Sequence, residues 1–151
     1  YREYYEEKGM FENEVYPGIK ELLRVLTKQG ILCLVATSKP EIYAKKILDY
    51  YKLRTYFHYI AGANMDGTRT DKAEVIAYAL KQIPAEYNNK KILMVGDRSH
   101  DIIGAKKNGI DCAGVLFGYG SREELEEAGA DFVADSVEAV RNIILLDTAM
   151  N

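Results

Sequence analysis

Apolar residues along this chain follow two alternating spacings. Short continuous apolar runs predict buried strands at 31–36, 59–63, 91–95, 113–117 and 132–134. Between these runs, apolar residues recur every three or four positions, which predicts helices with one buried face. The predicted helices open at Pro17-Gly18, within 38–41, at Asp71, at Asp101, within 121–124 and at Val137. Strands that alternate with helices predict an α/β fold, a three-layer Rossmann-like arrangement with a parallel sheet covered on both faces.

Polar residues mark where several of these helices begin. Ser38, followed by Pro40 and Glu41, forms a capping-box pattern and predicts a helix start there. Asp71 is followed by a glutamate three residues later, and Ser121 opens a similar pattern before a short helix. We therefore expect three of the helices to begin with side-chain caps.

Length and charge limit the possible classes of protein. The 151 residues are enough for one domain with a substantial core, and a net charge of −3 argues against a nucleic-acid-binding surface. Cys33 and Cys112 each lie inside an apolar run, which predicts small buried thiols in a reducing compartment. No apolar run is long enough to span a membrane, and the first residues do not look like a signal peptide. We expect a cytoplasmic protein without nucleic-acid or membrane partners.

The most informative segment is 92–105, where an apolar run ends in Gly96-Asp97 and Asp101 follows at the start of a helical pattern. Strands of open parallel sheets present their carboxyl ends at the edge where ligands bind. Gly96 allows a sharp turn there, and the two carboxylates can converge on one hard cation such as Mg²⁺. The motif alone is weakly specific, since acidic loops after strands are commonly just helix caps.

Two further strand ends carry groups suited to an anion. Thr37 and Ser38 offer a hydroxyl and backbone N–H groups after the 31–36 strand, although, taken alone, they are more commonly a strand-end residue and a helix cap. Lys72 lies in the first turn of a helix, where a positive charge opposes the helix dipole, yet most lysines are simply exposed. Donors for phosphate oxygens, an ammonium group and carboxylates for a cation together are the groups that phosphoryl transfer requires.

With these residues the chain resembles the haloacid dehalogenase (HAD) superfamily, and within it the phosphoglycolate-phosphatase-like group that carries a helical cap. The matching segments are Thr37-Ser38-Lys39-Pro40, the lysine motif at 71–76, the acidic motif at 96–109 and the tail at 115–121. Three motifs in the family's order are far more specific than any one of them. The similarity covers essentially the whole chain from Tyr16-Pro17-Gly18 onward.

The resemblance implies a role for each matching residue. Thr37 would hold a phosphoryl oxygen beside the Ser38 N–H, and Lys72 would bridge the phosphate and the nucleophile. Asp97 would bind Mg²⁺ directly, while Asp101 would bind it through water or orient the part of the site that contains Asp97. No role is expected for His100 in the acidic loop or for His58.

The family's first motif, Asp-x-Asp-Gly-Thr with its nucleophilic aspartate, does not occur at the start of this chain. By resemblance, residues 1–16 would be a remnant of the cap and hinge, and residues 17–151 the hydrolase core without its first, central strand. We therefore expect two unpaired strand edges, at 31–36 and 91–95, with a gap between them. The gap would be filled by a missing N-terminal segment or by a complementing strand.

The segment Asn64-Met65-Asp66-Gly67-Thr68 imitates that motif but lies between the hydroxyl and lysine motifs, with Asn64 at the nucleophile position. A permuted or disabled motif is one interpretation. A strand end followed by a glycine turn is the simpler one, and it leaves Asp66 as at most an edge residue.

The resulting hypothesis is a Mg²⁺-dependent phosphatase core for a small phosphomonoester such as phosphoglycolate, a nucleoside monophosphate or a sugar phosphate. The chain alone would be inactive, because the aspartate that forms the aspartyl-phosphate is absent. The alternative is a non-catalytic phosphate- or partner-binding module. A receiver domain uses similar groups but places its acidic residues first and its lysine last, so the order Thr37, Lys72, Asp97 excludes it.

Overall fold

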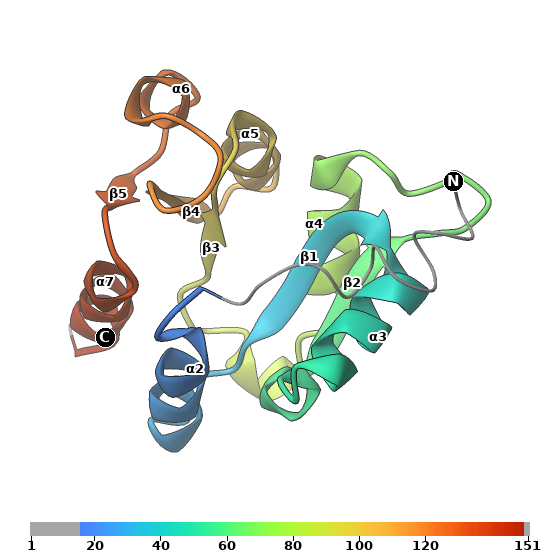
Figure 1. The fold of residues 1–151 in the computed structure, drawn as a ribbon, viewed down its shortest axis with the longest axis horizontal. Coiled ribbons are helices and arrows are strands. Elements are labelled where there is room, and N and C mark those ends of the chain that lie inside the picture. Colours follow the sequence, from blue (N-terminus) through green and yellow to red (C-terminus); the bar gives the residue numbers. More distant parts are fainter. Residues whose placement is uncertain (1–15, 150–151) are drawn as a thin grey trace.

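The computed structural model describes residues 16–149, in which helices and strands alternate as the sequence predicts (Figure 1). The predicted cap remnant at 1–16 lies outside the described residues except for Tyr16. The helices are α2 (Ile19–Lys28), α3 (Glu41–Tyr50), α4 (Lys72–Leu80), α5 (Ser99–Lys107), α6 (Arg122–Glu127) and α7 (Val137–Ala149). The strands are β1 (Leu34–Pro40), β2 (Tyr59–Ala63), β3 (Leu93–Gly96), β4 (Asp111–Val115) and β5 (Phe132–Ala134). Two short 3₁₀ turns, η2 (Arg54–Tyr56) and η3 (Ala85–Tyr87), lie in the connections.

The strands form two parallel sheets. One contains β1 and β2, with Leu34 opposite Tyr59, and the other has the order β3-β4-β5, with Leu93 opposite Asp111. Every crossover passes through at least one helix, as parallel neighbours require. The predicted α/β class is therefore confirmed.

Helices cover both faces of the sheets and make three layers. On one face α5 and α6 pack on β4 through a cluster of Ile102, Ala105, Cys112 and Leu125, and α4 packs on β1 and β2 beside them. On the other face α2 and α7 pack on β4 and β5 through Leu26, Val115, Ala134 and Val140. Leu22, Leu23 and Leu26 of α2 recur at helical spacing in the sequence, and all three are buried.

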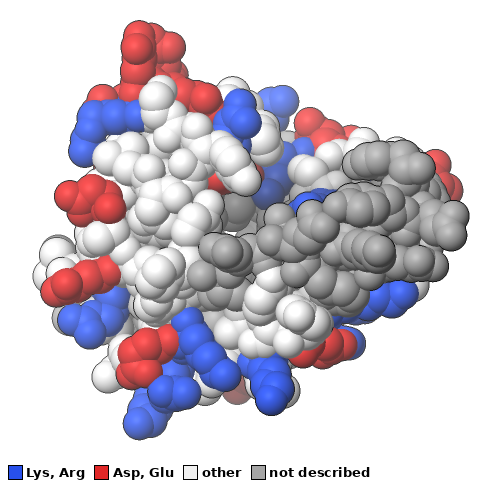
Figure 2. Space-filling model, viewed as in Figure 1, with Lys and Arg blue, Asp and Glu red and all other residues white. Residues whose placement is uncertain are grey.

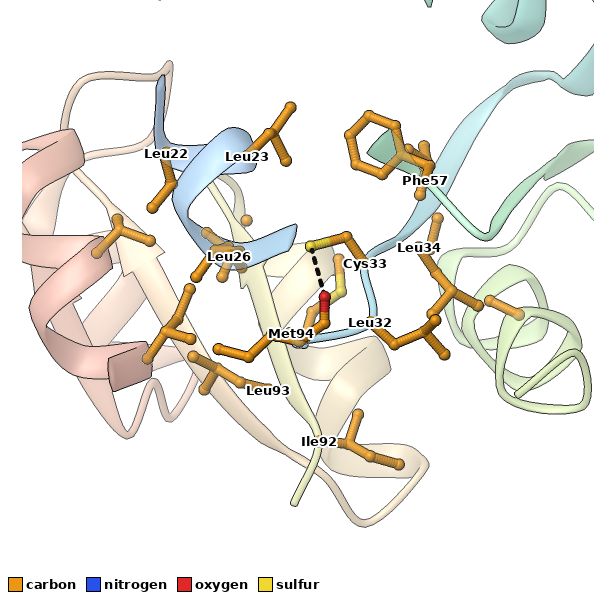
Figure 3. Close-up of a pocket in the computed structure, with 18 of the residues that line it drawn as sticks. Leu22, Leu23, Leu26, Leu32, Cys33, Leu34, Phe57, Ile92, Leu93 and Met94 are labelled. Carbon is orange, nitrogen blue, oxygen red and sulfur yellow. Dashed lines mark hydrogen bonds between the residues drawn. The ribbon is translucent and has the colours of Figure 1, made fainter. Parts of the chain in front are cut away.

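An open cleft separates the two sheets. Within residues 16–149, β1 pairs with β2 alone and β3 with β4 alone, so the two strand edges that face each other carry no ladder hydrogen bonds. The cleft has a volume of about 740 Å³ and is lined by apolar side chains of β1, β3, α2 and α4. Figure 3 shows Leu26 of α2, Cys33 before β1 and Met94 of β3 around it. The predicted gap between these strands is confirmed.

The helical layers hold the two halves of the molecule together. Helices α4 and α5 pack against each other, and the side-chain amide of Asn108 donates a 3.0 Å hydrogen bond to the Ala73 carbonyl. A Cβ added to Gly104 would lie 3.1 Å from the Ala73 nitrogen, so the helices approach closely at this point. These contacts fix α4, which packs on β1 and β2, relative to β3, although β1 and β3 do not pair.

Several predicted boundaries are wrong. Strand β1 begins at Leu34 rather than at 31, and β4 spans Asp111–Val115 rather than 113–117. Two further errors concern the chemistry of the strand ends. Strand β1 runs to Pro40, and α3 begins at Glu41 without a side-chain cap, so Ser38 does not cap it. Instead the Glu41 carboxylate accepts the Gly62 N–H from β2. Helix α5 begins at Ser99, two residues before the predicted start, which places Asp101 inside its first turn.

The thiols, the surface charges and the helices of the described residues bear on the expectations from composition. Cys33 and Cys112 are free thiols, half-buried and buried respectively, and burial raises the pKa of both. Positive and negative side chains are mixed around the margin of the face in Figure 2. Among the helices of the described part, none has the length and apolar character needed to cross a membrane.

Candidate active site

The acidic loop between β3 and α5 is organised by Asp101. As the third residue of α5, Asp101 reaches back to the start of the helix, and its Oδ2 accepts the backbone N–H groups of Asp97 (3.0 Å) and Arg98 (3.2 Å). These bonds satisfy N–H groups that a helix start leaves without partners. A Cβ at Gly96 would overlap the Asp101 side chain, so this close approach requires glycine. The loop is thereby folded around a buried carboxylate.

Lys72 meets this carboxylate from the other half of the molecule. Its Nζ lies 2.9 Å from Asp101 Oδ1, and the two side chains are 11% and 6% exposed. Asp71 caps α4 by accepting the Ala73 N–H, as predicted, and so fixes the turn that presents Lys72. A buried ion pair therefore joins the predicted lysine and acidic motifs.

Asp97 is held by the segment that follows β4. Its Oδ2 accepts the Tyr119 N–H at 2.9 Å, and its backbone carbonyl accepts the Gly120 N–H at 2.9 Å. A Cβ at Gly118 would overlap the Asp97 side chain, so the loop after β4 can pass this close only with glycine there. The Asp97 carboxylate therefore has a fixed orientation, with Oδ2 engaged by the Tyr119 backbone.

Thr37 and Ser38 lie at the carboxyl end of β1, across the cleft from Asp97. Ala36 pairs with Ala61 and Pro40 with Ala63, so the intervening residues of β1 bulge out of the ladder. The hydroxyl of Thr37 accepts the Lys39 N–H at 3.1 Å. Both Ala36 and Asp97 line the cleft, and the arrows of β1 and β3 point to the same side of the molecule in Figure 1. Of the predicted residues, Lys72, Asp97 and Asp101 are thus joined by contacts, while Thr37 and Ser38 lie on the facing strand end.

The residues present suit a hard divalent cation only in part. Mg²⁺ in proteins is commonly held by one or two carboxylates, with water and substrate phosphate completing its octahedron. Asp97 offers one such carboxylate, whereas both oxygens of Asp101 are engaged by Lys72 and by backbone N–H groups. In the described part of the chain, no cluster of three or more His, Cys, Asp or Glu side chains surrounds a metal position. The donor set therefore suits Mg²⁺ bound directly by Asp97, with Asp101 orienting the loop.

Several residues near this site were not anticipated from the sequence. Tyr16 stacks edge-on against Phe117 at 5.2 Å, and burial together with the nearby Asp97 charge raises the pKa of its phenol. Glu124 of α6 binds the acidic loop through Ser99 and Arg98. Glu124 is far from Asp97 in the sequence. The sequence predicts only that Glu124 is part of the helix-cap pattern that begins at Ser121.

The two histidines differ in their distance from the acidic loop. His100 is 56% exposed, and its Nε2 lies 3.8 Å from Asp101 Oδ1. The ring of His58 forms a 3.1 Å hydrogen bond with the Gln82 carbonyl, near the opposite end of β2 from Thr37 and Lys72.

The segment 64–68 is a self-contained turn. The Asp66 carboxylate accepts both the N–H (3.0 Å) and the hydroxyl (2.7 Å) of Thr68, and these bonds lower its pKa. Gly67 has a φ of +88°, which favours glycine, and Asn64 donates to the Thr68 hydroxyl. The simpler interpretation as a glycine turn is confirmed, because the side chains of Asn64, Asp66 and Thr68 bond to one another within the turn.

Parallel strands that carry a lysine–aspartate pair and an oriented carboxylate at their carboxyl ends define an α/β protein. The model of the family "Haloacid dehalogenase-like hydrolase" matches residues 1–115. The chain belongs to this family, so the resemblance seen in the sequence is confirmed.

Three comparisons illustrate the relationship. A 5'-nucleotidase of Pseudomonas aeruginosa is 39% identical over 95% of this chain and 64% of its own length. The tyrosine-protein kinase PtkA of Mycobacterium tuberculosis strain H37Rv is 37% identical over 95% of this chain and 50% of its own. The crystal structure of a predicted phosphatase from Clostridium acetobutylicum superposes with a TM-score of 0.88 at 44% identity, over 96% of this chain and 66% of that one. The chain thus spans about half to two thirds of the length of these relatives.

Proposed function

We propose that this chain is the phosphate- and metal-binding core of a Mg²⁺-dependent phosphomonoester hydrolase. The observation that carries the proposal is the junction of Lys72, Asp101 and Asp97 at the carboxyl ends of parallel strands, within contacts of about 3 Å. Such a site gathers an ammonium group and an oriented carboxylate where ligands of α/β sheets bind. The ammonium group, and a cation held by the carboxylate, can neutralise the negative charge of a phosphate. Such neutralisation, together with positioning, is the main requirement of phosphoryl transfer.

Each residue has a distinct part in this proposal. The hydroxyl of Thr37 and the N–H of Ser38 donate to phosphoryl oxygens, and Lys72 neutralises them while Asp101 holds its ammonium in place. Asp97 binds Mg²⁺, which when present offsets the negative charge of the phosphate and the nucleophile. A bulge at Thr37–Lys39 turns that segment out of the ladder, which supports a binding role for it.

The nucleophile is proposed to come from a strand that fills the cleft between β1 and β3. Such a strand would bond both unpaired edges, bury the apolar lining and end beside Asp97 and Thr37. By resemblance to the family it would end in Asp-x-Asp-Gly-Thr. The first aspartate would attack phosphorus and displace the alcohol, and water would then hydrolyse the aspartyl-phosphate.

Strand docking can be tested with a synthetic peptide of six alternating valine and isoleucine residues, three lysines before them for solubility and Asp-Gly-Asp-Gly-Thr after them. At 100 times its dissociation constant, the peptide should stabilise the chain by ~2.7 kcal/mol and raise its melting temperature by about 5–10 °C. Calorimetry measures the shift, and backbone hydrogen exchange should show new protection along β1 and β3.

Two controls make this test specific. A peptide with proline at its third strand position lacks an N–H and cannot extend the ladder, so it should give no shift. Val95 lines the cleft and is 38% exposed, so Val95→Glu should prevent docking while changing the stability of the free chain little. A melting temperature that saturating peptide leaves unchanged would contradict strand docking.

The proposed substrates are small phosphomonoesters: phosphoglycolate, a nucleoside monophosphate or a sugar phosphate. The 5'-nucleotidase relative supports the nucleoside monophosphate among them. The test is hydrolysis of p-nitrophenyl phosphate and of these esters by the protein encoded by the complete gene. We expect turnover with Mg²⁺ that stops on adding EDTA and resumes with excess Mg²⁺, whereas turnover that is unaffected by EDTA would overturn the proposed metal site.

Transfer of the phosphoryl group to a protein hydroxyl is a second candidate, favoured by the similarity to PtkA. Incubation with labelled ATP and a tyrosine-bearing peptide distinguishes the two, since label then appears on the peptide rather than as inorganic phosphate. A non-catalytic phosphate- or partner-binding module predicts neither product.

A further inference from the structure

We infer that Glu124 of α6 is the positioning residue that fixes the acidic loop for Mg²⁺ binding. This inference rests on the proposed function, since it concerns the metal site assigned to Asp97. Glu124 Oε2 accepts the Ser99 N–H at 2.7 Å and the Arg98 Nε–H at 2.9 Å, and the carboxylate side chain is 28% exposed. Both donors directly follow Asp97 in the chain.

The start of α5 has an unusual need for this contact. Its N-cap residue is Arg98, and a guanidinium has donors only, so it cannot accept the N–H groups that a helix start leaves free. Asp101 accepts the N–H groups of Asp97 and Arg98, and Glu124 accepts that of Ser99. Glu124 therefore accepts, from another helix, an N–H group of the first turn of α5, as an N-cap serine or aspartate accepts one further along the same turn.

Glu124 is itself well fixed. Its own N–H donates to the Ser121 hydroxyl that caps α6, and the preceding Gly120 donates to the Asp97 carbonyl. The segment from Tyr119 to Glu124 thus holds the acidic loop at Asp97, at Arg98 and at Ser99. The Arg98 guanidinium and the Ser99 N–H also lower the pKa of Glu124, because both donate hydrogen bonds to its charged form.

The consequence for Asp97 is geometric. Its Oδ2 is engaged by the Tyr119 N–H, and a cation can be met by the remaining oxygen only if the backbone at residues 97–99 keeps its orientation. Without Glu124 the first turn of α5 loses an acceptor, and the loop can rotate about its remaining bonds to Asp101. Residues of this supporting kind commonly change metal affinity by 10–100-fold.

The test is Mg²⁺ titration of this chain, followed by the backbone amide NMR shifts of residues 97–99. Glu124→Ala should weaken Mg²⁺ binding about tenfold. It should also move the Ser99 amide proton upfield, because its hydrogen bond to a carboxylate is lost. Glu124→Gln retains an oxygen that accepts this N–H, so it should recover part of the affinity.

The matched control is Glu123→Gln, which removes the same charge from an exposed position of the same helical turn. Glu123→Gln should leave the Mg²⁺ affinity within twofold of that of the original chain. If the loss of one negative charge were what weakens binding, this variant would weaken it too. Melting curves of each variant establish that it is folded, and a purely structural role would lower the melting temperature without changing the Mg²⁺ affinity of the folded chain.

Three results overturn the inference: an unchanged affinity in Glu124→Ala, equal losses in Glu124→Ala and Glu124→Gln, or an equal loss in Glu123→Gln. Asp97→Asn serves as the reference for the proposed function. If Asp97→Asn fails to weaken Mg²⁺ binding, the assigned metal site is wrong. If it does weaken binding while Glu124→Ala does not, only the role of Glu124 fails.

Discussion

Replacing Asp97 with asparagine is expected to lower Mg²⁺-dependent phosphatase turnover by about 10²–10³-fold, the scale of loss when a group that stabilises developing charge is removed. Asparagine has nearly the same shape, and its amide oxygen can still accept the Tyr119 N–H that holds Asp97 Oδ2 at 2.9 Å. The loop should therefore keep its fold. What is lost is the negative charge proposed to bind the cation.

The measurement is the initial rate of aryl phosphate hydrolysis over a range of Mg²⁺ concentrations, with the protein encoded by the complete gene. Asp111→Asn is the matched control, because Asp111 is an exposed carboxylate at the amino end of β4, far from the carboxyl-end site. The control should keep full activity. A variant at Asp97 that retains more than a tenth of the rate at saturating Mg²⁺ would contradict direct metal binding by this residue.

The fold could be predicted because each element carries its own local signal. The strand at Phe132–Ala134 and the helix capped by Asp71 were placed correctly from apolar runs and cap residues alone. The gap between the sheets followed from the family resemblance and from the absence of one apolar run. In both cases the relevant information lies within a few neighbouring residues or in the order of the motifs.

The strand ends were predicted less well, because tertiary contacts determine them. Ser38 has the sequence of a helix cap, yet β1 continues to Pro40 with its residues paired to β2 on either side of the bulge. The sequence predicts a helix start at Asp101, but the helix begins at Ser99, because Asp101 can accept backbone N–H groups that precede it in the chain. A cap pattern in the sequence shows which hydrogen bonds a side chain can form. It does not show which of the possible partners the folded chain brings into contact.

The supporting contacts of the site were beyond sequence reasoning for a related reason. Glu124 and Tyr119 reach Asp97 and its neighbours only when β4 is paired with β3 and α6 is packed against α5. The number of residues between the acidic loop and these two positions matches no sequence pattern that would predict the contacts. Close-approach glycines such as Gly118 are the one sequence trace of this packing, and their meaning is visible only from the distances.

Removing Asp101 is expected to destabilise the chain by about 3–5 kcal/mol, the usual effect of breaking a buried ion pair by deleting one partner. Asp101→Ala leaves the Lys72 ammonium, 11% exposed, without its counter-charge and leaves two loop N–H groups without an acceptor. Urea denaturation measures the loss. Asp111→Ala, at an exposed position, should cost less than 0.5 kcal/mol by the same method.

A double-mutant cycle separates the ion pair from the loop bonds. Lys72→Met keeps the length of the side chain but removes its charge, so Asp101 remains bonded to the backbone and loses only its partner at 2.9 Å. Asp101→Asn in that background neutralises the remaining buried charge and keeps an oxygen for the N–H groups of Asp97 and Arg98. The double variant should therefore be more stable than the sum of the single losses predicts, by about 1–3 kcal/mol. Strict additivity would mean that solvent already screens the pair, and Lys72 would then be free to move toward a phosphate without any opposing cost from Asp101.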